Sequence, residues 1–201
     1  MKPNQITDWD AETLRRTHIA TDYFRAGYNC SQSVAMTFAD LYDIPVPLMA
    51  RLSASYGGGI GRMRETCGSA LGIFMLAGLE VTNVDDTPEE PSARRSQFSL
   101  TKATKVDKSN CPILYPSQQL KKKNYEVVQR LAAHFRAQTG SILCKELLGL
   151  NKQRADGTIP EIQICATPEA RTDEYYRKRP CIRMVETATR IYMNYLREKY
   201  G

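Results

Sequence analysis

Six cysteines are the residues of this 201-residue chain whose type best suits them to chemistry. Four of them share one setting, because each is expected in the first turn of a helix and on its apolar side: Cys30, Cys67, Cys144 and Cys181. The unpaired N–H groups at a helix start stabilise a thiolate, which can act as a nucleophile or as a metal ligand. We therefore expect a site made of these four cysteines, with Cys67 as the most activated thiol.

Residues around the cysteines support this expectation in part and also leave an alternative role open. Basic side chains that could lower a thiol pKa stand close in sequence to three of the four: Arg64, Lys145, Arg179 and Arg183. Cys111 and Cys165 differ, because they fall in segments without helical periodicity. No Cys-x-x-Cys pair occurs, so any site must be assembled from separate helices. Free cysteine also fills apolar cores, so packing alone is an alternative role.

A glycine-rich run precedes the second of the four cysteines, with Gly57, Gly58, Gly59 and Gly61 around Ile60. Glycine adopts unusual backbone angles at little cost, so this run can bring backbone N–H groups close to a ligand. We expect it to face an anion or a sulfur ligand beside Cys67, and it provides these candidate cofactor-binding residues: Gly58, Gly59, Gly61 and Arg62. A tight connection between two helices is the alternative. A dinucleotide site is not expected, because no strand precedes the run.

Helical periodicity dominates the rest of the chain. Apolar residues recur at helical spacing, with start and stop residues at the ends, in 10–26, 30–42, 48–55, 66–81, 117–138, 142–148 and 180–199. The segments 82–117 and 151–179 resemble loops, with Ile159, Ile162 and Ile164 as a brief extended piece. We predict an all-α fold with negligible strand, in which 1–201 form a single domain of about five to seven helices.

Composition excludes several classes of protein. The hydrophobic share of 42% and charged share of 25% are those of an ordinary globular protein. Six cysteines are too few for a disulfide scaffold. The net charge of +6 is mild and its densest run is Lys121–Lys123, so we expect no nucleic-acid partner. The longest apolar stretch, 70–79, is too short to span a membrane.

The beginning of the sequence bears on location. Residues 1–17 carry Asp8, Asp10 and Glu12 and contain no apolar run, which is unlike a secretory signal. We expect a cytoplasmic protein. A reducing compartment favours thiols that are buried, redox-active or metal-bound over permanent disulfides.

The order of motifs along the chain resembles a known family. The similar segments are Asn29-Cys30-Ser31-Gln32-Ser33-Val34, Gly57-Gly58-Gly59-Ile60-Gly61-Arg62, Thr66-Cys67-Gly68-Ser69-Ala70-Leu71-Gly72, Cys144-Lys145-Glu146-Leu147-Leu148-Gly149 and Cys181. They look like the redox-active protein family named for its C…GCAxxG…C…C cysteine pattern, over roughly 24–195. The resemblance implies a small all-helical protein whose four patterned cysteines are redox-active or metal-associated. Thr66 and Gly68 depart from the pattern, which has Gly and Ala there.

Three interpretations of function follow. The first is a thiol-based redox protein, a thiol–disulfide oxidoreductase that meets a redox partner protein. The second is a metal-binding protein in which Cys30, Cys67, Cys144 and Cys181 hold zinc or an iron–sulfur cluster, since four thiolates are a complete ligand set. The third is a helical interaction module whose cysteines only pack. The apolar last helix is also compatible with a homodimer.

Overall fold

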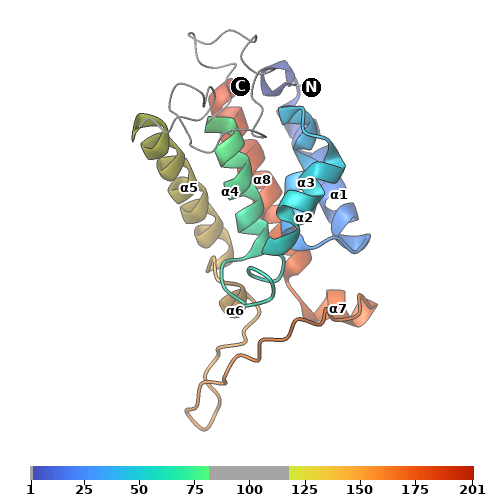
Figure 1. The fold of residues 1–201 in the computed structure, drawn as a ribbon, viewed down its shortest axis with the longest axis vertical. Coiled ribbons are helices and arrows are strands. Elements are labelled where there is room, and N and C mark those ends of the chain that lie inside the picture. The colour runs from blue at the N-terminus through green and yellow to red at the C-terminus, as the bar shows by residue number, and fades with distance from the viewer. Residues whose placement is uncertain (1, 82–117) are drawn as a thin grey trace, which may run out of the picture.

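The computed structural model describes residues 2–81 and 118–201 and is all-helical (Figure 1). In those residues it contains eight α-helices and no strand: α1 (Trp9–Arg25), α2 (Cys30–Thr37), α3 (Val46–Ser53), α4 (Gly68–Val81), α5 (Gln118–Thr139), α6 (Cys144–Leu147), α7 (Asp173–Lys178) and α8 (Cys181–Tyr200). Three short 3-10 helices accompany them: η1 (Pro3–Gln5), η2 (Ala39–Tyr42) and η3 (Ala54–Tyr56). The predicted fold class is confirmed. The predicted loop at 82–117, with Cys111, lies outside the described residues.

Local sequence signals set the helix ends. The carboxylate of Asp8 accepts a hydrogen bond from the Ala11 N–H at 3.0 Å and caps α1. The side chain of Asn29 caps α2 by accepting hydrogen bonds from the N–H groups of Ser31 and Gln32. In return, the side-chain oxygen of Gln32 accepts a hydrogen bond from the Asn29 N–H. Cys30 is thereby fixed as the first residue of α2.

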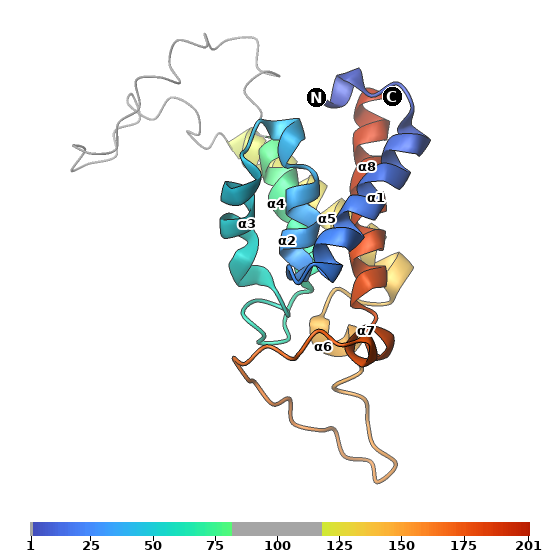
Figure 2. The same ribbon diagram turned by 90° about the vertical axis from the view of Figure 1, so that its right-hand side faces the viewer.

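The chain reverses direction between successive long helices, so α2, α4 and α8 all begin at the same end of the bundle (Figures 1 and 2). Cys30 and Cys181 are the first residues of α2 and α8, and Cys67 directly precedes α4. The two short helices α6 and α7 lie at this end as well (Figure 2). The up-and-down topology therefore gathers cysteines that are far apart in the sequence.

The core forms around α8. Its buried side chains include Val185, Ala188 and Tyr192, and α8 lies against α1, α2, α4 and α5. The ring of Tyr192 packs edge-on against Phe38, with 4.9 Å between ring centroids. Burying a large apolar side chain contributes about 1.5–3 kcal/mol, so this face is a main source of stability. The apolar face that suggested a homodimer is thus covered within the chain itself.

The structure adds one helix that periodicity misses. In α7 the hydroxyl of Thr172 accepts a hydrogen bond from the Tyr175 N–H at 3.2 Å, and two acidic residues follow in the first turn. This six-residue helix has no apolar stripe, so its cap was the usable signal. The segment expected as a brief extended piece forms no strand among the described residues, and its Ile159 and Ile164 are 68% and 66% exposed.

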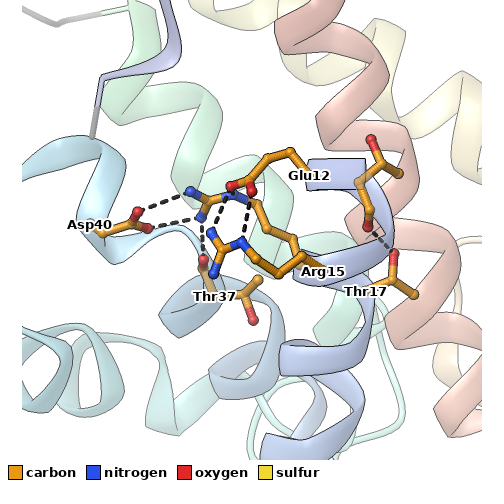
Figure 3. Close-up of polar contacts among 7 residues, drawn as sticks. Glu12, Arg15, Thr17, Thr37 and Asp40 are labelled. Carbon is orange, nitrogen blue, oxygen red and sulfur yellow. Dashed lines mark hydrogen bonds and ion pairs between the residues drawn. The ribbon is translucent and has the colours of Figure 1, made fainter. Parts of the chain in front are cut away.

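The opposite end of the bundle holds a buried ion-pair network (Figure 3). The fully buried Arg16 donates to Glu12 at 2.6 Å, to both carboxylate oxygens of Asp40 at 2.8 and 2.9 Å, and to the carbonyl of Thr37 at 2.5 Å. Burial opposes ionisation of Glu12 and Asp40, but their arginine partners outweigh it, so both carboxyl pKa values are lowered. Each of the three guanidinium nitrogens of Arg16 therefore donates to an acceptor within the chain.

Within the described residues, no helix has the length and apolarity needed to cross a membrane.

Candidate functional site

The four patterned cysteines line one cavity of about 300 Å³, at the end of the bundle where α2, α4 and α8 begin. Cys67 and Cys144 are 5% and 8% exposed, whereas Cys30 and Cys181 are half-buried. All five cysteines in the described part of the chain are free thiols. The four cysteines that the sequence pattern singles out therefore line the same cavity.

A short backbone pairing ties Cys144 to Cys67. The N–H of Cys67 donates to the carbonyl of Ile142 at 2.7 Å, and the N–H of Cys144 donates to the carbonyl of Glu65 at 2.6 Å. Thr66 and Leu143 form an isolated antiparallel bridge between the two segments. A pairing this short leaves no periodic pattern, so the sequence could not show it.

The glycine run forms a left-handed turn. Five successive residues, 58–62, have φ between 56° and 74°, and Arg64 follows with φ 65°. Hydrogen bonds close the turn, from Arg62 N–H to the Gly57 carbonyl at 3.1 Å and from Glu65 N–H to the Gly59 carbonyl at 3.2 Å. Non-glycine residues pay about 1–2 kcal/mol each for this conformation, and such strain concentrates at functional sites. The turn places Arg62 and Arg64 in the cavity wall.

Two glycines allow close approach to the thiols. A Cβ at Gly59 would lie 2.7 Å from Cβ of Cys144, and a Cβ at Gly68 would lie 3.1 Å from Sγ of Cys30. Gly59 thus abuts Cys144, while Gly58 and Gly61 line the cavity that Cys67 also lines. Of the four predicted cofactor-binding residues, Gly58, Gly61 and Arg62 line the cavity and Gly59 supports its wall.

The buried thiols do not ionise easily. Burial and the neighbouring thiols Cys30 and Cys144 raise the pKa of Cys67, although the N–H groups at the start of α4 act in the opposite direction. Burial, with the same charge effect from Cys30, also raises the pKa of Cys144 and raises that of Cys181 to about 12. The prediction that its helix start activates Cys67 is wrong, because burial outweighs the helix-terminal N–H groups.

Cys30 is the thiol common to these interactions. Negative charge on Cys30 would raise the pKa of each of the other three thiols. For each of them, this effect is larger than that of any other neighbouring charge. Cys165 stands apart, since it is exposed and outside the cavity lining. Hydrogen bonds from Thr167 lower the pKa of the Cys165 thiol.

Four arginines also line the cavity: Arg62, Arg64, Arg171 and Arg179. Glu169 is the carboxylate among the described lining residues. Arg64 and Arg179 stand close to cysteines in the sequence, and Arg62 belongs to the glycine run, whereas no sequence pattern marks Arg171 and Glu169, which come from the irregular segment before α7. Arg183 and Lys145 do not line the cavity; Lys145 pairs with Glu65 at 3.3 Å.

The thiols share a cavity without forming a ready metal cage. Among the described residues, no three His, Cys, Asp or Glu side chains are grouped closely enough to hold one ion. The fit to zinc or an iron–sulfur cluster through Cys30, Cys67, Cys144 and Cys181 would therefore require the sulfurs to move together. The histidines His18 and His134 are exposed.

The comparisons with known proteins agree with the pattern of cysteines. Residues 28–195 match the model of the family described as "Putative redox-active protein (C_GCAxxG_C_C)". No curated protein and no solved structure matches the chain. The family match covers most of the chain and includes all four cavity cysteines. The chain therefore belongs to this putative redox-active protein family, the C_GCAxxG_C_C proteins.

Proposed function

We propose that this protein carries two electrons on a cavity dithiol and exchanges them with a disulfide. The observation that supports this most is that four free thiols line one cavity. Membership of a family described as redox-active agrees with it.

Exposure and placement favour Cys30 as the first thiol to react. It is half-buried, whereas Cys67 is 5% exposed. Cys30 is also the first residue of α2, so the positive end of the helix dipole can stabilise its thiolate during attack. A Cβ at Gly68, the residue after Cys67, would lie 3.1 Å from Sγ of Cys30, so the chain beside Cys67 lies against this thiol. We therefore assign Cys67 as the second thiol of the pair.

The proposed step is a thiol–disulfide exchange. The Cys30 thiolate attacks one sulfur of an incoming disulfide, forming a mixed disulfide and releasing one thiol. Cys67 then displaces the second thiol. A Cys30–Cys67 disulfide remains, both electrons are on the released thiols, and the two protein thiol protons end on them. The reverse exchange with a reducing dithiol regenerates the protein.

Peptide mapping after oxidation tests this proposal. The reduced protein is incubated with hydroxyethyl disulfide, alkylated and digested. We expect one protein disulfide, joining Cys30 and Cys67, and an intact mass lower by two hydrogen atoms. Cys30→Ser should abolish it, and the control Cys165→Ser should leave it unchanged. Four alkylated cavity cysteines in the wild-type protein would contradict the proposal.

A four-cysteine metal or iron–sulfur protein is the second candidate, favoured by the single cavity that four thiols share. Cys30, Cys67, Cys144 and Cys181 would hold the group, and it would supply one-electron chemistry if it were a cluster. Metal analysis and a visible spectrum of anaerobically purified protein distinguish this candidate. Stoichiometric metal that is lost in Cys144→Ser would favour it over the dithiol.

A further inference from the structure

The cavity that holds the thiols carries an excess of positive charge. Its described lining contains four guanidinium groups, from Arg62, Arg64, Arg171 and Arg179, and one carboxylate, from Glu169. Burial keeps Cys67, Cys144 and Cys181 protonated at neutral pH, so they do not balance this charge. A low-dielectric pocket with one sign of charge concentrates ions of the opposite sign.

Glu169 shows that this wall can receive a carboxylate. One oxygen, Oε1, lies 3.5 Å from Nη2 of Arg62 and 3.9 Å from Nη2 of Arg64, and it also accepts a hydrogen bond from Nη2 of Arg179. These arginines lower the Glu169 carboxyl pKa against the opposing effect of burial. Three guanidinium groups thus converge on one carboxylate oxygen.

Arg171 has unused hydrogen-bonding capacity beside this cluster. Its guanidinium carbon lies 4.5 Å from the ring centre of Phe24 and 4.9 Å from that of Tyr175. Nη2 donates to the carbonyl of Tyr28 at 3.3 Å, but Nη1 is buried without a hydrogen-bond partner among the described residues. The rings attract the cation but do not accept a strong hydrogen bond. A buried donor left in this way costs about 1–3 kcal/mol, which an acceptor on a ligand would recover.

Size limits what can reach the thiols. A cavity of about 300 Å³ matches the lower end of small-molecule pockets. Cys30, the attacking thiol, is half-buried in the cavity lining beside the nearly covered Cys67, so a small disulfide can reach it more easily than a disulfide on the rigid surface of a protein.

We propose that the cavity selects small disulfides that carry carboxylate groups, and that Arg171 binds one of those carboxylates. This inference rests on the proposed function, because it names the substrate class of the same site. The exchange is the one described above: two protein thiols become one disulfide, and the small disulfide is reduced to two carboxylate-bearing thiols.

Three disulfides of similar size and different charge test the inference: dithiodipropionate, which is anionic, hydroxyethyl disulfide, which is neutral, and cystamine, which is cationic. The rate constant for oxidation of the reduced protein is measured for each and divided by the rate constant of free dithiothreitol with the same reagent. We expect the anionic reagent to exceed the neutral one by about tenfold or more in this ratio, and cystamine to be slowest. The preference should shrink as salt is added.

Substitution of the arginine locates the effect. Arg171→Gln should reduce the anionic-to-neutral ratio by about fivefold to tenfold, and this ratio is compared within each variant so that a general change in rate cancels. Arg171→Lys keeps the charge without the planar fork and should lie between the two. Arg197→Gln is the matched control, because Arg197 is exposed and pairs with Asp10 at 2.9 Å outside the cavity.

The outcomes separate the two proposals. Equal normalised rates for all three disulfides, or an unchanged ratio in Arg171→Gln, would overturn the selection of anions and leave the dithiol function standing. If none of the three oxidises the protein, the dithiol function itself fails. Dithiodipropionate that reacts fastest and loses its advantage in Arg171→Gln supports both.

Discussion

The two ends of the helical bundle both contain buried or half-buried arginines, and they treat them in opposite ways. At the end with η2, the guanidinium of Arg16 is enclosed by two carboxylates and a carbonyl (Figure 3). At the thiol end, Arg62, Arg64 and Arg179 share the carboxylate of Glu169, and Nη1 of Arg171 has no partner in the described chain. A saturated cluster holds the fold, whereas an unsaturated one can bind a ligand.

Physical costs explain this contrast. A buried ion needs a charged or hydrogen-bonding partner, because without one nothing offsets the free-energy cost of removing it from water. Arg16 meets that requirement within the chain. The cavity arginines meet it in part, through the rings of Phe24 and Tyr175 and through one shared carboxylate. The thiol end therefore gives up some stability for a site that can accept an anion.

The largest expected effect is at the saturated end. Arg16→Met should lower the free energy of unfolding by about 3–5 kcal/mol, because it leaves Glu12 and the Thr37 carbonyl without their buried partner. Urea titration measures this loss. Asp40→Asn, a milder change at a half-exposed residue, should cost about 1 kcal/mol. If Arg16→Met costs less than Asp40→Asn, the network does not hold the fold.

The next largest loss of stability is expected from substitution of two glycines in the turn at the thiol end. Gly59→Ala should cost about 3 kcal/mol or more, because its Cβ would meet Cβ of Cys144 at 2.7 Å and backbone at 2.8 Å. Gly61→Ala has a similar positive φ but open space, and should cost about 1–2 kcal/mol. Thermal unfolding compares the two. Equal losses would mean that the approach to Cys144 is not tight.

Because the pKa values of the buried cavity thiols are raised in the folded protein, we expect the protein to lose stability in alkali. In the folded protein the pKa of Cys67 is raised, while in the unfolded chain this thiol ionises near its usual value of 9.0. Stability is therefore full below about pH 9 and falls above it by about 1.4 kcal/mol per pH unit for each such thiol. Between pH 9 and 10, urea titrations should show a shallower fall in Cys67→Ser.

Cys165→Ser is the control for this pH dependence. Cys165 is exposed and its pKa is lowered, so its ionisation favours the folded state. Its removal should not make the alkaline loss shallower. If it does, or if Cys67→Ser has the same slope as the wild-type protein, the cavity thiols are not protonated in the way described.

The smallest effect sharpens the comparison of the two arginine clusters. Arg171→Gln should change the free energy of unfolding by at most about 1 kcal/mol, because the lost ring contacts are offset by removal of an unpartnered buried donor. This is several-fold less than the loss expected for Arg16→Met. A loss as large as that of Arg16→Met would make Arg171 a structural residue and remove the basis for the anion site.

Much of this fold is readable from the sequence. The apolar stripes and end signals predict both ends of α1, α4, α5 and α8 to within two residues, whereas the predicted helix 30–42 divides into α2 and η2. The common position of Cys30, Cys67 and Cys181 at helix starts also predicts their convergence, because alternate helices of a bundle begin at the same end. The family pattern, which the match over 28–195 confirms, points to the same cysteines.

The rest depends on contacts that sequence order hides. Helix starts suggest lowered thiol pKa values, but burial has the larger effect, and burial at Cys67 follows from the tertiary packing of α2, α4 and α6. Arg171 and Glu169 come from a segment without periodicity, so no pattern marks them before the chain folds over the cavity. The pairing of Thr66 with Leu143 is too short to leave a signal.

Anaerobic redox titration is the measurement that tests the central claim most directly. Reduced protein is titrated in a glutathione-free dithiothreitol buffer series, with metal content determined on the same sample and cavity thiols counted at each potential. The dithiol account predicts a reversible two-electron transition without metal, in which two thiols disappear together, and its absence in Cys30→Ser. A one-electron transition that follows bound metal, or four thiols that persist at every potential, would contradict it.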